Sequence, residues 1–311
     1  MRMVTNQMTM RRNGGDRDMK IGLLDVDGCH WPSLPQMKLS AYHKQRGDTV
    51  EKWFPMNHYD TLYVSKVFTH SPDEPCVFYA DEIVQGGTGY FYPDGGPPLP
   101  DVIEHCYPDY SLYGALTENM AYGFLTRGCP RNCGFCIVSK KEGRSAKQVA
   151  DLSEFWSGQR EVKLLDPNLL ACLDREKLLG QLAESHAAVD FTQGLDIRLV
   201  NGIEPLILSL RIKRLHFAWD DPSEDLRPCF QRFQSRTGLP RWKMIVYVLT
   251  NFGSTHEQDL ERIYFLRDTG YDPYVMVYER DTAPKETKHL QRWVNNRRIF
   301  RACPRFEEYR P

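Results

Sequence analysis

The chain has 311 residues, and its 40 lysines and arginines nearly balance its 41 aspartates and glutamates, giving a formal net charge of −1. This balance provides no global attraction to nucleic acid or to an anionic membrane, so any nucleic-acid partner would need a local basic surface. No apolar run approaches the roughly 20 residues that cross a bilayer, and we expect no membrane partner.

Nine cysteines, an odd number, fit a reducing compartment better than a secreted disulfide framework. The first residues also lack an apolar signal-peptide core. We therefore expect a cytoplasmic protein whose thiols are free or bound to metal.

In chain order, residues 1–18 are polar and predict a disordered tail. The segment 19–90 predicts a small open α/β domain, because strand-like runs flank one helical pattern that stops at a glycine. The predicted strands are KIGLLDVDG (20–28), TVEKWF (49–54), TLYVSKVF (61–68) and DEIVQGG (81–87), and the predicted helix is LPQMKLSAYHKQRGD (34–48).

Glycine and proline crowd the stretch 86–100, and we expect a linker over 91–118. Beyond it, over 119–311, six strand-like runs alternate with helical ones. This alternation predicts a parallel sheet, and six units predict a partial (β/α)6 TIM-like barrel. The strand-like runs are AYGFLTRG (121–128), EVKLLDPN (161–168), VDFTQG (189–194), RLHFAWDD (214–221), KMIVYVLTN (243–251) and DPYVMVYE (272–279).

The most specific motif is CPRNCGFC, which places Cys129, Cys133 and Cys136 in C-x-x-x-C-x-x-C spacing directly after a predicted strand. A [4Fe–4S] cluster normally takes four protein thiolates, so three of them leave one iron open to another ligand. Gly128 and Gly134 allow the loop to curl around one centre. The motif therefore predicts a metal site held by these three cysteines.

This loop resembles that of the radical S-adenosylmethionine superfamily, in which an aromatic residue precedes the last cysteine, as Phe135 does here. The resemblance implies that S-adenosylmethionine binds the open iron and that the backbone of Phe135 helps to hold its adenine. It further implies reductive cleavage to a 5′-deoxyadenosyl radical, which abstracts hydrogen from a substrate that the sequence leaves unknown. An electron donor such as flavodoxin or ferredoxin is then expected as a partner.

A three-cysteine zinc site and a non-catalytic iron–sulfur module remain alternatives. Neither a zinc knuckle nor a ferredoxin-like carrier finds its fourth ligand nearby, because Cys106 and Cys172 are distant in sequence.

Polar residues follow the predicted barrel strands, where such barrels carry their sites. The QGLDIR segment resembles one in the family that approaches S-adenosylmethionine; Arg198 could pair with its carboxylate and Asp220 could accept from a ribose hydroxyl. For each residue a helix cap or a surface ion pair is the alternative role, and no catalytic residue is assigned. The candidate cofactor-binding residues are Phe135, Asp166, Asn168, Gln193, Asp196, Arg198 and Asp220.

The first domain resembles a shortened cobalamin-binding domain of the kind that precedes the barrel in cobalamin-dependent family members. This resemblance implies cobalamin as a further cofactor and methylation as the reaction. The histidine of the D-x-H-x-x-G signature is replaced by Asp27. A degenerate scaffold or a substrate-recognition domain is the alternative.

Two further segments allow a second interpretation. Asp25 and Asp27 in LLDVDG resemble the nucleophile loop of haloacid-dehalogenase-type phosphatases, where two aspartates bind magnesium and attack phosphate.

The basic, aromatic stretch 288–306 could contact nucleic acid. A last barrel helix that buries Leu290, Trp293 and Val294 explains that stretch better.

Overall fold

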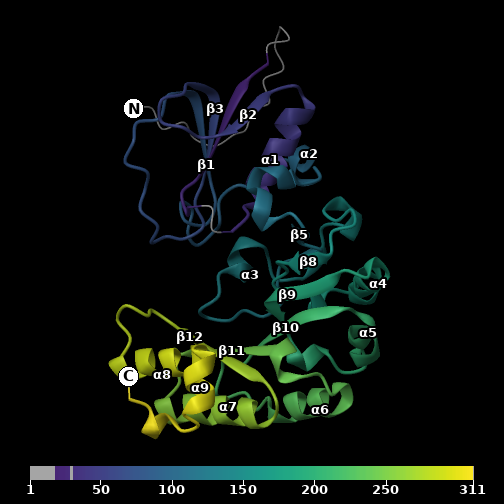
Figure 1. Ribbon diagram of the computed structural model, residues 1–311, viewed down its shortest axis with the longest axis vertical. Helices are drawn as coiled ribbons and strands as arrows, with labels where there is room; N and C mark the ends of the chain where they lie inside the picture. Colours follow the sequence, from purple (N-terminus) through teal and green to yellow (C-terminus); the bar gives the residue numbers. More distant parts are fainter. Residues whose placement is uncertain (1–17, 29–30, 311) are drawn as a thin grey trace. The chain divides into compact units, whose positions relative to one another are not determined.

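The computed structural model describes residues 18–28 and 31–310, and the chain divides into two compact units that meet in sequence between Asn119 and Met120 (Figure 1). The expected tail, 1–18, lies outside the described residues except for Asp18. The expected linker, 91–118, belongs to the first unit and contains helix α2 (Asp101–Glu104) and a 3-10 turn at Tyr110–Leu116.

The first unit is built on four parallel strands in the order β2-β1-β3-β4. Apolar residues of β1 pack against α1 and α2, with Ile21, Leu23, Leu39 and Ile103 forming a buried cluster. The connection 53–58 between β2 and β3 holds no helix, so the unit has fewer helices than a doubly wound sheet normally carries. The elements are β1 (Lys20–Asp25), α1 (Leu34–Gln45), β2 (Thr49–Lys52), β3 (Tyr59–Ser65) and β4 (Ala80–Gly86).

The second unit is built on six parallel strands that lie side by side in chain order, from β5 to β12. Each predicted barrel strand is present. The strands are β5 (Met120–Gly123), β8 (Glu161–Leu164), β9 (Ala188–Leu195), β10 (Ile212–Ala218), β11 (Met244–Thr250) and β12 (Asp272–Val277). An antiparallel pair, β6 (Thr126–Arg127) with β7 (Lys147–Gln148), stands apart from this sheet.

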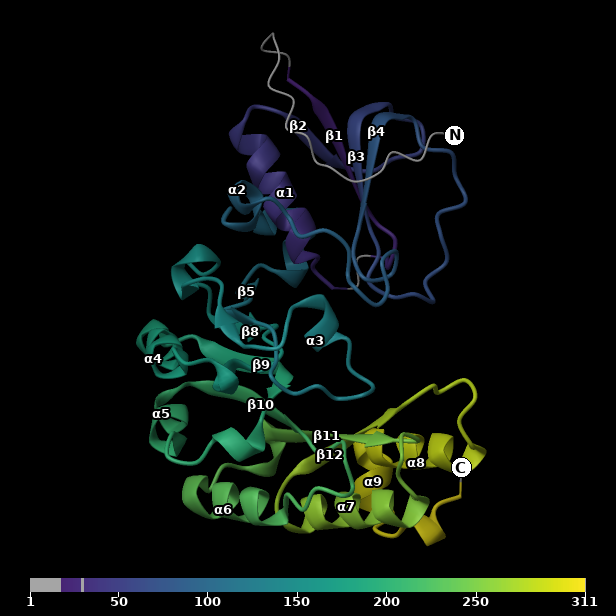
Figure 2. The same ribbon diagram turned by 180° about the vertical axis from the view of Figure 1, so that it is seen from behind.

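Helices fill the connections, and those that follow β8, β9, β10 and β11 lie along one side of the six-stranded sheet (Figure 2). Alternation along β10 explains this arrangement: Phe217 faces α6 and packs against Phe230 and Phe233, whereas His216 faces the opposite side. The helices are α3 (Val138–Lys141), α4 (Arg175–Ser185), α5 (Glu204–Ser209), α6 (Arg227–Thr237), α7 (His256–Asp268), α8 (Lys285–Asn295) and α9 (Arg297–Ala302).

Helix α8 follows the last strand and buries Leu290, Trp293 and Val294, as the sequence predicts for a closing helix. The Trp293 indole N–H donates to the carbonyl of Cys303 (2.9 Å), which fixes the chain after α9. A mixed α/β fold with parallel sheets is therefore confirmed. Within the described ranges, none of the helices combines the length and the apolar character that a membrane span requires.

Candidate functional site

The three motif cysteines lie on the loop that leaves β5 and leads to α3. Gly128 opens this loop with a φ of 84°, and the backbone carbonyl of Ser145 lies only 2.3 Å from where a Cβ would stand. The backbone N–H of Cys129 donates to the carbonyl of Gly143 (3.1 Å), which ties the start of the loop to the chain just after α3. The loop therefore starts at the C-terminal edge of the sheet, where α/β proteins carry their sites.

The thiols of this loop are electrostatic neighbours. Burial raises the pKa of Cys133 and Cys136, and negative charge on Cys129 and Asp220 raises the pKa of both further. Arg131 opposes this effect at Cys133 by donating a hydrogen bond. Burial and neighbouring negative charge therefore both favour the protonated thiols over the thiolates in this loop.

Asp166 and Asn168, which follow β8, form hydrogen bonds to the cysteine loop and to the residues that lead into it. The Asp166 carboxylate accepts hydrogen bonds from the backbone N–H groups of Leu125 (3.2 Å) and Thr126 (2.5 Å) and from the Thr126 hydroxyl (2.7 Å). The Asn168 side-chain amide donates to Cys129 Sγ at 3.5 Å, within the range for a sulfur acceptor. Asp166 thus positions the chain that enters the loop, and Asn168 contacts a motif cysteine directly.

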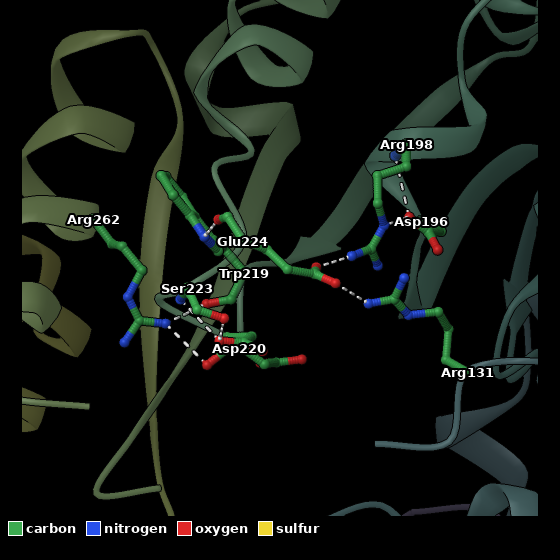
Figure 3. Close-up of polar contacts among 9 residues, drawn as sticks. Arg131, Asp196, Arg198, Trp219, Asp220, Ser223, Glu224 and Arg262 are labelled. Carbon is green, nitrogen blue, oxygen red and sulfur yellow. Dashed lines mark hydrogen bonds and ion pairs between the residues drawn. The ribbon is translucent and has the colours of Figure 1, made fainter. Parts of the chain in front are cut away.

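A bridge of charges joins the cysteine loop to the ends of β9 and β10 (Figure 3). The Glu224 carboxylate accepts from Arg131 at 2.7 Å and also from Arg198. Arg198 additionally donates to Asp196 at 2.6 Å, and the indole N–H of Trp219 donates to the Glu224 carbonyl (2.9 Å). The guanidinium of Arg198 is therefore engaged by two carboxylates.

Asp220 lies at the end of β10, beside a buried guanidinium. Arg262 donates to the backbone carbonyls of Trp219 (2.6 Å) and Asp220 (3.1 Å) (Figure 3). It also donates to the carbonyl of Leu249 (2.9 Å), so it fastens the ends of β10 and β11. Burial raises the pKa of Asp220 to about 6, although Arg262 and Arg198 lower it. Asp220 is thus a carboxyl whose charge changes close to neutral pH.

Aromatic rings from the last strands meet the cysteine loop. The Phe135 ring packs edge-on against Phe252 (5.4 Å between centroids), and Phe252 packs against Tyr278 (4.8 Å). Phe252 follows β11 and Tyr278 follows β12. The structure thereby brings together the loop and the C-terminal ends of five further strands.

Among the sequence-predicted site residues, Gln193 is exposed on β9, and no hydrogen bond joins it to the others in the described part of the chain. In the first unit, the Asp27 carboxylate accepts from the backbone of Val67 (2.6 Å) and from the Ser71 hydroxyl (2.6 Å). Asp25 accepts from Tyr113 (3.2 Å), and burial raises its pKa. Both aspartates therefore hold their own unit together.

Sequence reasoning missed Arg131, Glu224, Phe252 and Arg262. Phe252 stands directly after a predicted strand, so inspection of that strand end could have found it. Arg131 lies inside the motif itself. Glu224 and Arg262 carry no local signal, because only the folded chain brings them to the strand ends.

Within residues 18–28 and 31–310, no three His, Cys, Asp or Glu side chains form a group that could hold a metal ion. Comparison of the chain with protein-family models and with curated proteins finds no match. The assignment of a function therefore depends on the residues and their geometry.

Proposed function

We propose that the second unit is a radical S-adenosylmethionine enzyme built on a partial (β/α)6 TIM-like barrel. The observation that carries this proposal is the C-x-x-x-C-x-x-C loop, which follows the first strand of a parallel sheet whose strands lie in chain order. Such an order arises when each strand–helix unit adds its strand beside the previous one, as in a β/α barrel.

Contacts around the loop support an iron–sulfur cluster, whose binding would require the three motif thiols to draw together, since they do not form a metal-binding group in the described residues. Asn168 Oδ1 is buried without a hydrogen-bond partner while its amide nitrogen donates to Cys129, so this side chain is oriented by the loop and has an unused acceptor. The thiols of Cys129, Cys133 and Cys136 would hold three irons, and the fourth would be left to the amino and carboxylate groups of S-adenosylmethionine. When bound, these cofactors supply one-electron cleavage of the sulfonium and an adenosyl radical for hydrogen abstraction.

The chain's own residues have separate tasks in this proposal. Asp166 fixes the entry to the loop, and the Phe135–Phe252 pair closes one side of it. Arg198 can bind the carboxylate of the cofactor only if Glu224 moves aside, because both Glu224 and Asp196 now accept from it. Asp220, whose negative charge raises the pKa of Cys133, remains the candidate for a ribose hydroxyl.

Anaerobic purification and reconstitution with iron and sulfide test the proposal. We expect about four irons per chain and formation of 5′-deoxyadenosine from S-adenosylmethionine under strong reductant. Changing Cys129, Cys133 and Cys136 together to alanine should abolish both, whereas Cys76→Ala, at an exposed thiol of the first unit, should change neither.

Three outcomes would contradict the proposal. Zinc in place of iron would assign a zinc site, and a stable cluster without 5′-deoxyadenosine would assign a non-catalytic module. If the triple variant retained its iron, the three cysteines would not be the iron ligands.

The same protein can also be assayed for cobalamin-dependent methylation and for phosphatase activity. The first unit has the strand order 2-1-3-4 that begins a flavodoxin-like doubly wound sheet, which favours a nucleotide- or cobalamin-binding ancestry. Asp27 occupies the place of the signature histidine and is engaged by its own loop, so we derive no step through cobalt. Formation of S-adenosylhomocysteine only with added cobalamin would identify methylation as the reaction. Release of phosphate in the presence of magnesium would identify Asp25 and Asp27 as a phosphatase site.

A further inference from the structure

The face of the second sheet that is turned away from α6 and its neighbouring helices carries polar and aromatic side chains. The strand registers place Lys163 beside Asp190 and Asp190 beside Arg214, so charges alternate in one row across β8, β9 and β10. His216 is the next residue on this side of β10. It is 6 % exposed, and its ring stacks on Tyr247 of β11 (5.3 Å, 12° between the planes).

One side of the His216 ring is fixed by hydrogen bonding. Nδ1 lies 3.1 Å from the carbonyl of Phe191 and 3.5 Å from the Asp190 carboxylate, which favours the tautomer with its proton on Nδ1. Nε2 is then an acceptor. Within the described residues Nε2 has no hydrogen-bond partner, and it is not among the fully buried unpartnered atoms, so part of its surface remains accessible.

Small residues stand beside His216. Ala218 is the next residue on the same side of β10, and a Cβ built on Gly194 of the neighbouring β9 would lie 3.6 Å from the backbone carbonyl oxygen of His216. Asp220 follows on this side, about 13 Å along the strand from His216 at the usual rise per residue. On this side of β10, Ala218 is thus the residue between His216 and the strand end that carries Asp220.

The charges of this face favour an anion. Lys163 lies over the Tyr122 ring (5.5 Å) and Arg214 is exposed, and neither forms an ion pair within the part of the chain that the structure describes. Asp190 is the single carboxylate of the row and is directed at His216. Two cations without paired carboxylates therefore flank one histidine.

We propose that this face binds an anionic small molecule through Lys163 and Arg214, and that Nε2 of His216 accepts a proton from it. The inference rests on the proposed function only in taking this molecule to be the substrate. In the step, a bond between hydrogen and a heteroatom or carbon of the substrate breaks, its electron pair stays on the substrate, and the proton goes to Nε2. Asp190 offsets the charge of the imidazolium.

The groups that face the imidazole explain its neutral starting state. Burial lowers the pKa of His216, the charges of Arg214 and Lys163 lower it further, and Asp190 raises it. The fourth neighbour, Tyr247, has its own pKa raised to about 12 by burial and stays uncharged. A bound anion should raise the pKa of His216, because it stabilises the imidazolium.

The test follows the imidazole of His216 by NMR in the full-length, histidine-labelled protein, with its signal assigned by loss in His216→Gln. Inorganic phosphate and benzoate are added separately, so that the two arms distinguish a phosphate from a carboxylate ligand. We expect at least one of the two anions to shift the signal saturably and to raise the pKa of His216. Arg214→Gln, at an exposed site, should weaken that binding about tenfold, a loss of 1.4 kcal/mol.

Arg211→Gln is the matched control, because Arg211 is an exposed arginine just before β10 and outside the charged row. An equal loss of anion affinity in this control would show that the effect comes from the overall charge and not from Arg214, and it would overturn the proposal. So would a His216 signal that neither anion moves, or a pKa that saturating anion leaves unchanged. The titration needs no iron, so failure of the cluster proposal and failure of this site are separately visible.

Discussion

Asn168 is the residue whose single side chain links the end of β8 to a motif cysteine. Its amide donates to Cys129 Sγ at 3.5 Å, and hydrogen bonds to metal-bound sulfur orient the ligand and tune the metal. We expect Asn168→Ala to weaken cluster binding about tenfold, the lower end of the usual range for such outer contacts. Iron retained during chelator titration of the reconstituted protein measures the effect.

The control for this change is Asn201→Ala, which removes an exposed contact to Arg236 (3.0 Å) far along the chain from the cysteines. Equal iron loss in both variants would show that the effect is general destabilisation and not the contact to Cys129.

Asp166 predicts a pH dependence of stability. Burial raises its pKa from 3.8 to about 6, although the hydrogen bonds from Thr126 and Leu125 lower it. Because the folded pKa lies above the unfolded one, the contribution favours the fold at acid pH and is lost as the pH rises through about 6. A shift of about 2 units corresponds to about 3 kcal/mol.

Urea unfolding of the wild type and of Asp166→Asn at several pH values tests this. The wild type should lose about 3 kcal/mol relative to the variant between about pH 4 and about pH 7, on top of a constant difference from the altered hydrogen bonds. Asp225→Asn, at an exposed carboxyl, should run parallel to the wild type. A difference between wild type and Asp166→Asn that does not change with pH would refute the raised pKa.

At the scale of elements, a matched pair of glycines, Gly128 and Gly143, flanks the segment that contains the motif cysteines and α3. Both Gly128 and Gly143 have a left-handed φ, but a Cβ on Gly128 would meet the Ser145 carbonyl at 2.3 Å, whereas Gly143 has open space. Gly143→Ala should therefore lower the free energy of unfolding by about 1–2 kcal/mol, the strain of the left-handed conformation alone.

Gly128→Ala should exceed that loss and reduce iron binding, because the backbone that leads into Cys129 must shift. Thermal unfolding and iron content of both variants decide the matter. If the two variants behave alike, the close approach at Ser145 does not constrain the loop.

The elements themselves were largely predictable because apolar runs and glycine stops are local signals. Strand β11 is nearly all apolar and the segment of α1 ends at a glycine stop, and both elements were predicted from the sequence. The site was predictable only where one short segment contains it, as with the cysteines. Glu224 and Arg262 act through contacts with distant strand ends, and sequence spacing carries no information about such contacts.

The expected linker illustrates a different limit. Glycine and proline between 86 and 100 do exclude a long helix, but the chain beyond them still packs in the first unit, where the Tyr113 hydroxyl donates to Asp25 (3.2 Å) and to Gln36 (3.2 Å). Composition indicates where regular structure is weak. It does not reveal that a few well-placed polar contacts can bind an irregular segment to its unit.

At the scale of the whole molecule, the two units predict a defined proteolytic cut. The chain passes from one to the other between Asn119 and Met120, and Glu118 and Asn119 are exposed just before the boundary. Exposed segments between compact units are preferred cleavage sites, since few contacts resist their local opening. Brief digestion with a glutamate-specific protease should therefore cut after Glu118, and Glu118→Gln should block that cut.

Mass spectrometry identifies the fragments. The 119–311 fragment should keep its cooperative thermal transition and the iron of the reconstituted protein, because all three motif cysteines and their contacts lie within it. A fragment that unfolds at once or releases its iron would mean that the second unit needs the first to maintain its fold.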